Sequence, residues 1–109
     1  MLFSSLYGVD LGTDTIKLRD RSGEKFMYSR NMIAVRNKKT VLAIGDAAFE
    51  MFEKNPKDVE VTCPMVNGVI ASATYMELVL SYTLKTFTSF THKSSGVCIA
   101  VPTNVAPVE

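Results

Sequence analysis

The stretch YGVDLGTDT, residues 7–15, decides how this chain of 109 residues begins to fold. An apolar run over residues 6–11 meets the turn Gly12-Thr13-Asp14, and an alternating apolar and polar segment over residues 15–19 follows it. Two such segments joined by a glycine-containing turn are typical of a β-hairpin. We therefore predict two antiparallel strands that meet at Gly12.

Three further strand-like segments follow, at residues 25–28, 32–35 and 41–44. Polar turns separate them, with Arg21-Ser22-Gly23-Glu24 before the first and Asn37-Lys38-Lys39 before the last. Connections this short favour antiparallel pairing, because parallel neighbours need a crossover of about a dozen residues or more. The sequence thus predicts an antiparallel meander.

The hydrophobic period changes after residue 45. Residues 46–54 carry apolar side chains at helical spacing, and Pro56 predicts the end of this helix, since proline disfavours helix at the residue before it. Residues 59–63 are predicted as a strand that stops at Pro64. Residues 68–71 are predicted as a short apolar link.

A second, longer helix is predicted over residues 75–90. Thr74, followed three residues later by Glu77, matches a capping box, and apolar side chains on nearly all sides of the helix favour a core position. Residues 97–101 are predicted as a buried strand. The combination predicts an α/β fold whose sheet mixes antiparallel and parallel pairs. Because no helix follows the last strand, we expect the chain to stop mid-fold.

Composition places the chain among ordinary globular proteins. Hydrophobic residues make up 47% and charged residues 21%, and a formal net charge of +1 supplies no basic surface for nucleic acid. No apolar run reaches the ~18 residues of a spanning helix, and the first residues lack the charged start of a signal peptide. Cys63 and Cys98 show neither a disulfide framework nor a zinc spacing. We therefore expect a cytoplasmic protein.

The hairpin also carries the residues best suited to chemistry. Its first strand delivers one carboxylate, Asp10, to a turn where Gly12 permits close backbone approach and successive N–H groups can bind an anion. Thr13 and Thr15 offer hydroxyl donors, and Lys17 offers a positive charge. In phosphoryl transfer, Asp10 would hold a metal-bound water beside the terminal phosphate. A plain hairpin with a solvated aspartate is the alternative that the residues alone leave open.

Three blocks of the sequence resemble the actin/Hsp70/sugar-kinase ATPase superfamily and, within it, the bacterial actin MreB. YGVDLGTDT resembles the first phosphate loop, usually I-G-I-D-L-G-T. AIGDAAFEMFEKNPKDVEVTCPMVNGVIAS, residues 43–72, resembles an MreB segment without a gap, and VCIAVPTNVAPVE, residues 97–109, is similar to a strand that ends in V-P. Residues 64–71 discriminate against an Hsp70-type chaperone or another nucleotide switch, which is the alternative within the superfamily.

The resemblance implies an actin-like ATPase (ribonuclease H-like) fold, of which this chain is the N-terminal third. Residues 1–30 and 71–109 would belong to the large subdomain, and residues 31–70 to a small subdomain insertion. ATP with Mg²⁺ would bind in a cleft, and Asp10 would be the catalytic residue. The cofactor-binding residues would be Gly12, Thr13, Asp14, Thr15 and Lys17. Asp14 stands where the family usually has a small residue.

The resemblance further implies a cytoskeletal ATPase that polymerises with copies of itself. Its filaments would guide cell-wall synthesis at the inner face of the cytoplasmic membrane. A third hypothesis is a non-catalytic interaction fragment, because half a cleft cannot enclose a triphosphate, and the residues leave open whether this chain is an enzyme. In MreB-like proteins an apolar loop before the V-P strand enters the membrane, and Phe90 lies close to that place. We expect Phe87 and Phe90 in the core, with membrane insertion of Phe90 as the alternative.

Overall fold

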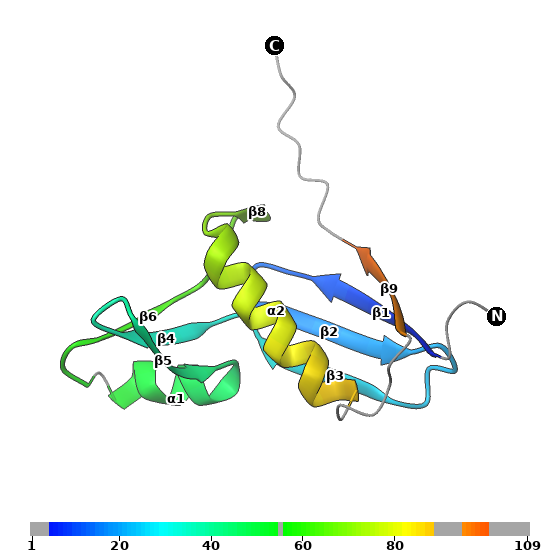
Figure 1. The fold of residues 1–109 in the computed structure, drawn as a ribbon, viewed down its shortest axis with the longest axis horizontal. Helices are drawn as coiled ribbons and strands as arrows, with labels where there is room; N and C mark the ends of the chain where they lie inside the picture. Colours follow the sequence, from blue (N-terminus) through cyan, green and yellow to red (C-terminus); the bar gives the residue numbers. More distant parts are fainter. Residues whose placement is uncertain (1–4, 55, 89–94, 101–109) are drawn as a thin grey trace, which may run out of the picture.

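A computed structural model describes residues 5–54, 56–88 and 95–100 (Figure 1). In chain order these residues form β1 (Ser5–Leu11), β2 (Thr15–Asp20), β3 (Phe26–Arg30), β4 (Ile33–Arg36), β5 (Thr40–Ile44), α1 (Asp46–Lys54), β6 (Val59–Thr62), β7 (Met65–Val66), β8 (Val69–Ile70), α2 (Ala73–Thr88) and β9 (Ser95–Ala100). The predicted α/β class is confirmed.

The first sheet has the strand order β3-β2-β1-β9. Its pairs are antiparallel except for β1 with β9, which run parallel because the chain returns through α2 between them. β1 and β2 form the predicted hairpin, with Leu11 opposite Ile16 beside the turn. The prediction of a sheet that mixes parallel and antiparallel pairs is therefore confirmed. The predicted burial of the last strand is wrong at Ile99, which stays 44% exposed because β9 is an edge strand.

A second, antiparallel sheet has the order β5-β4-β6, and α1 packs against it. The predicted antiparallel pairing of neighbouring strands is confirmed for β2 with β3 and for β4 with β5, but the meander is divided, because β3 and β4 belong to different sheets. The N–H of Asn31 donates to the carbonyl of Asp14 (3.0 Å), and the N–H of Gly45 donates to the carbonyl of Met32 (2.9 Å). These two hydrogen bonds direct the chain out of the first sheet and into the second.

The start of α2 is set by Ser72. Its Oγ accepts a hydrogen bond from the N–H of Tyr75 (3.2 Å), which is the usual N-cap arrangement. The predicted capping box at Thr74 and Glu77 is therefore wrong, and the helix begins at Ala73. The reason is a long-range contact, since the N–H of Ser72 donates to the carbonyl of Pro64 (3.2 Å) and holds Ser72 at the turn before the helix.

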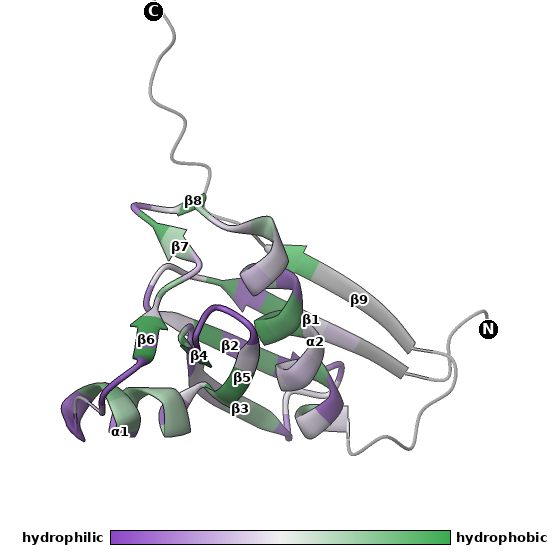
Figure 2. Cartoon of the chain, turned by 60° about the vertical axis from the view of Figure 1, so that its left-hand side comes forward, coloured by the Kyte–Doolittle hydropathy of each residue, from purple (hydrophilic) through white to green (hydrophobic). Residues whose placement is uncertain are grey.

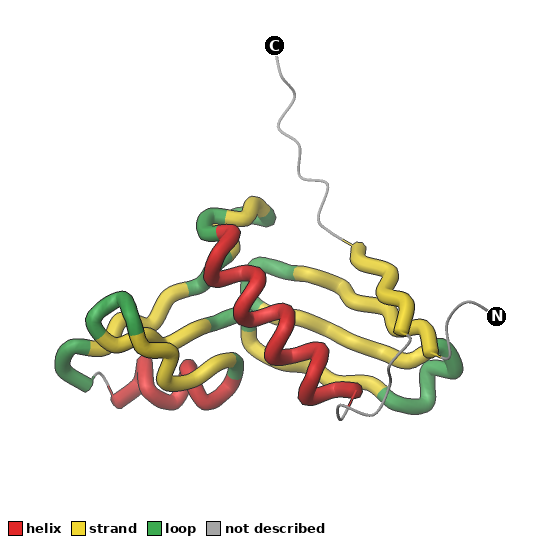
Figure 3. The backbone as a smooth tube through the Cα atoms, viewed as in Figure 1, coloured by secondary structure: helices red, strands yellow, loops and turns green. Residues whose placement is uncertain are grey.

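α2 lies across one face of the first sheet (Figures 1 and 3). Its buried residues recur every three or four positions, at Met76, Val79, Thr83 and Phe87. Leu78 and Tyr82, on the opposite side, are 40% and 54% exposed. The helix is thus buried on one side only, and the predicted all-round core position is wrong.

The main core lies between α2 and the hairpin. The side chains that β1 and β2 bury against the helix are Tyr7, Val9, Leu11, Ile16 and Leu18. The ring of Phe87 meets the ring of Tyr7 edge-on, with centroids 5.6 Å apart, which confirms the predicted core position of Phe87. Lys25 Nζ donates to the carbonyl of Phe87 (2.6 Å) and satisfies an acceptor at the end of the helix.

The segment predicted as an apolar link is a small hairpin, β7–β8. Asn67 and Gly68 form its turn with φ values of 52° and 78°. Two successive positive φ values characterise a type I′ turn, which Asn-Gly favours. The dipeptide was therefore a signal for this hairpin within the sequence itself.

The predicted membrane or core position of Phe90 lies outside the described residues. Within the described ranges, neither helix is long and apolar enough to cross a membrane.

Candidate functional site

The turn between β1 and β2 is closed by its own backbone. The N–H of Gly12 donates to the carbonyl of Thr15 (3.0 Å). A Cβ atom at position 12 would lie 2.8 Å from that same carbonyl oxygen, closer than real Cβ atoms come. Glycine is therefore needed here for the turn to close, and the close approach of a ligand to the Gly12 backbone stays a prediction.

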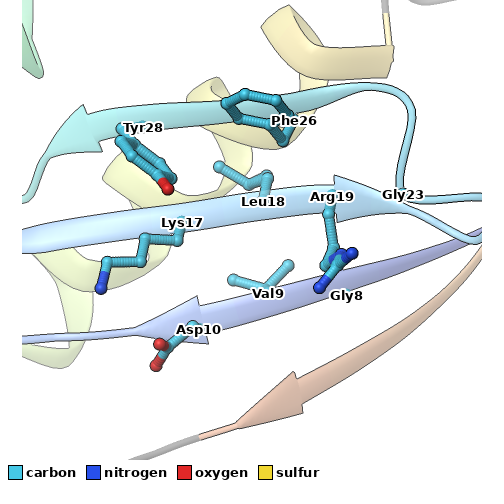
Figure 4. A pocket seen from close by; sticks show the side chains of 9 residues that line it. All are labelled: Gly8, Val9, Asp10, Lys17, Leu18, Arg19, Gly23, Phe26 and Tyr28. Atoms are coloured by element: carbon cyan, nitrogen blue, oxygen red, sulfur yellow. The ribbon is translucent and has the colours of Figure 1, made fainter.

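Asp10 and Lys17 lie opposite each other near the turn. Both side chains are exposed, and their neighbours along the strands, Val9 and Leu18, are buried against α2. Figure 4 shows Asp10 and Lys17 beside a hollow of about 620 Å³ on the face of the sheet that α2 leaves open. The other residues that line this hollow are Gly8, Val9, Leu18, Arg19, Gly23, Phe26 and Tyr28.

The tip of the hairpin contacts the turn of β7–β8. Thr13 Oγ1 accepts a hydrogen bond from the N–H of Gly68 (2.7 Å), so the hydroxyl keeps its own proton to donate elsewhere. Within the described part of the chain, no hydrogen bond engages the backbone N–H groups of Thr13 and Asp14. Adjacent amides of a turn that have no partner form the kind of concavity that binds an anion.

The negative charge of the Asp14 carboxylate affects the ionisation of the Cys63 thiol. Burial raises the pKa of the Cys63 thiol, and the negative charge of Asp14 raises it further. The thiol is therefore protonated at neutral pH, which makes it a weak nucleophile. Asp14 itself is exposed.

Asn31 supports the turn from the inside. It is fully buried, and its Nδ2 donates to the carbonyl of Gly12 (2.9 Å) and lies 3.7 Å from Met76 Sδ. Its backbone N–H holds the carbonyl of Asp14, as described above. Asn31 was not among the predicted site residues, because a single polar residue before an apolar strand is a weak signal.

The predicted site residues thus fall into two groups. Asp10, Lys17 and the partly exposed Thr15 belong to the strands, on the open face of the sheet. The remaining three, Gly12, Thr13 and Asp14, form the turn. The two groups adjoin each other along the chain, since the turn joins the end of β1 to the start of β2.

Comparison with known proteins identifies the relatives of the chain. Residues 4–109 match the family model described as MreB/Mbl protein. The chain belongs to the MreB/Mbl family. Over 111 residues it is 30% identical to the cell shape-determining protein Mbl of Bacillus cereus, and the match covers 99% of this chain. It covers 33% of that relative, so the chain spans about a third of the length of the MreB/Mbl protein that it matches.

Two solved structures have the same fold as this MreB/Mbl chain. MreB5 of Spiroplasma citri bound to ADP superposes with a TM-score of 0.75 at 27% identity, over 94% of this chain and 31% of that one. The MamK double helical filament gives a TM-score of 0.70 over 94% of this chain and 34% of that one, and at 20% identity it shows the fold alone. The predicted actin-like fold is confirmed, and MreB is favoured over an Hsp70-type protein.

Proposed function

We propose that this chain is the N-terminal third of an MreB-type cytoskeletal ATPase that polymerises and guides cell-wall synthesis. The observation that carries the proposal is the β1–β2 hairpin, where Asp10 and Lys17 face each other beside a turn with two amides free of partners in the described chain. Membership of the MreB/Mbl family and the ADP bound to the related MreB5 support a nucleotide as the ligand.

In this proposal residues 31–70 form the small subdomain, and residues 1–30 with 71–109 form part of the large one. The strand arrangement supports this division. The sheet β5-β4-β6 lies within residues 33–62, whereas the sheet β3-β2-β1-β9 combines strands from both flanks of that segment. The hairpin would then form one wall of a nucleotide cleft.

Four residues of the hairpin have roles in this cleft. The amides of Thr13 and Asp14 and the Thr13 hydroxyl donate to phosphate oxygens, and Lys17 adds a positive charge to the same group. Asp10 orients the water that attacks the terminal phosphate. A single exposed carboxylate fits Mg²⁺, which usually keeps several waters and takes few protein ligands beside phosphate. When bound, Mg²⁺ neutralises charge on the phosphates.

Polymerisation is proposed from family membership and from the open sheet face. Phe26 and Tyr28 are each 64% exposed there, side by side with ring centroids 5.8 Å apart. Contiguous exposed apolar groups of this kind mark surfaces that another protein or another part of the chain covers. We accordingly expect the protein to self-associate.

The test uses the natural polypeptide that contains this chain. It should bind Mg-ATP in isothermal titration, hydrolyse it and sediment as filaments. Asp10→Ala should lower kcat about 10²-fold with little change in Kd, because a residue that orients the attacking water acts in the transition state. Lys17→Ala should instead weaken nucleotide binding. Arg19→Ala is the control: Arg19 lies two residues further along β2 from the turn, and its removal should leave Kd unchanged.

Wild-type protein that binds no nucleotide would overturn the proposal. An equal loss of affinity in Asp10→Ala and Lys17→Ala would show that Asp10 is structural. The 109-residue chain alone should bind Mg-ATP weakly and should not turn it over, since the hairpin is one wall of the cleft. Low-micromolar affinity of the chain alone would mean that the hairpin suffices or that two copies complete each other.

A further inference from the structure

We infer that Asn31 is a positioning residue for phosphate binding: its side-chain amide orients the Gly12–Thr13 peptide so that the N–H of Thr13 points to the phosphate. This inference rests on the proposed function, because it needs an anion at the turn. It assigns a role to a residue at the junction of the two sheets, between β3 and β4.

The orientation follows from the geometry of one peptide group. Asn31 Nδ2 donates to the carbonyl of Gly12 (2.9 Å), and the carbonyl of Gly12 shares a planar trans peptide with the N–H of Thr13. In such a unit the C=O and N–H bonds point in opposite directions. Because the carbonyl is held toward the buried Asn31, the N–H of Thr13 must point away from the core.

Two further hydrogen bonds make this orientation rigid. The backbone N–H of Asn31 donates to the carbonyl of Asp14 (3.0 Å), and the N–H of Gly12 donates to the carbonyl of Thr15 (3.0 Å). Three carbonyls of one turn are therefore held by donors. A turn fixed in this way does not have to reorganise its amides when the anion binds, which is the advantage of a preorganised site.

The polarity of Asn31 argues for a donor role over a packing role. Its Oδ1 is buried and has no hydrogen-bond partner among the described residues. A leucine of similar size would remove this unpaired oxygen, but it would also leave the carbonyl of Gly12 without its side-chain donor. The asparagine is thus unfavourable at Oδ1, and its favourable side-chain contacts are the hydrogen bonds that Nδ2 donates to the Gly12 carbonyl and to Met76 Sδ.

Thr83 provides the matched control. It is the other buried polar residue of the described chain, and its hydroxyl donates to the carbonyl of Val79 within α2 (2.7 Å). Thr83→Val removes a buried donor at constant shape, as Asn31→Leu does. The hydrogen bond of the Thr83 side chain stays within α2 and does not reach the β1–β2 turn. The two variants therefore separate the loss of any buried donor from the loss of the donor to Gly12.

The experiment compares Asn31→Leu with Thr83→Val in the natural polypeptide. Titration with Mg-ADP should show a Kd raised about 10- to 100-fold in Asn31→Leu, as expected when a binding group is misplaced. Thr83→Val should keep the wild-type Kd. Without nucleotide, hydrogen exchange at the Gly12 amide should be faster in Asn31→Leu alone. A role confined to folding would lower the melting temperature and leave Kd and local exchange unchanged.

Two results would overturn the inference: a wild-type Kd in Asn31→Leu, or an equal rise of Kd in Thr83→Val. If the wild-type protein binds no Mg-ADP, the proposed function fails, and the exchange rate at Gly12 then decides by itself whether Asn31 orients the turn. If Asn31→Leu does not fold, Asn31→Ala with Thr83→Ala as its control gives the same comparison, because a smaller side chain fits the same space.

Discussion

The two faces of the β1–β2 hairpin differ sharply although their residues alternate along the same strands. Under α2, Val9 and Leu18 are at most 2% exposed, while their neighbours Asp10 and Lys17 are exposed on the other face. Figure 2 shows hydrophobic and hydrophilic segments following one another along β1 and β2. A register slip of one residue would move every side chain to the opposite face. Burial of the apolar face therefore determines where Asp10 and Lys17 lie.

The largest expected effect compares two phenylalanines. Phe87 is 2% exposed under the covered face, and Phe26 is 64% exposed on the open face. Phe87→Ala should lower the free energy of unfolding by about 3–5 kcal/mol through the lost contacts and the cavity. Phe26→Ala should change it by about 0.5 kcal/mol or less. Urea unfolding measures both. A large loss of unfolding free energy in Phe26→Ala would contradict this expectation and show that the open face is covered in solution.

A smaller effect is expected where the two faces meet, at the turn. Gly12→Ala should lower the free energy of unfolding by about 1–3 kcal/mol, because its Cβ would lie 2.8 Å from the Thr15 carbonyl oxygen. Gly8→Ala is the control within β1, since a Cβ there would lie 3.6 Å from Arg19 Cγ, an ordinary contact. Gly8→Ala should be neutral or slightly stabilising. Equal losses in denaturant titration would contradict the close contact at Gly12.

Thr13→Val tests the contact between the hairpin tip and the β7–β8 turn. It keeps the shape of the side chain but leaves the N–H of Gly68 without its acceptor, which should lower the free energy of unfolding by about 0.5–1.5 kcal/mol. Thr15→Val, on the strand side of the turn, is the control and should have little effect. The measurement is thermal or urea unfolding without nucleotide. Equal unfolding free energies of the two variants would mean that the hydrogen bonds of Asn31, and not the contact with Gly68, stabilise the tip.

The smallest expected effect concerns the thiol of Cys63. Burial and the charge of Asp14 both raise its pKa, so Asp14→Asn should lower that pKa and increase the thiolate fraction at mildly alkaline pH. Alkylation by iodoacetamide should therefore be faster in Asp14→Asn than in the wild type, with Cys98→Ser present in every protein compared. Asp10→Asn is the control, because its carboxylate is on the open face of the sheet. Equal rates in all three proteins would place the Asp14 charge away from Cys63.

Local pattern in the sequence predicted the parts that depend on near neighbours. The alternation around Ile16 and Leu18 predicted the hairpin, and both residues are buried in the core. The parallel pairing of the last strand followed from its apolar character and the helix before it. The type I′ turn at Asn67-Gly68 is also local, and it was missed although its dipeptide is visible in the sequence.

The sequence by itself determined the secondary-structure elements, the faces of the hairpin and the position of its glycine turn, because side-chain periodicity and turn chemistry act over a few residues. Only the tertiary structure decided where the meander divides, where α2 begins and what supports the turn. Each of these depends on hydrogen bonds between distant residues: Asn31 with Gly12 and Asp14, and Ser72 with Pro64. A buried polar group must find a partner wherever the fold brings one, and no local pattern specifies that partner.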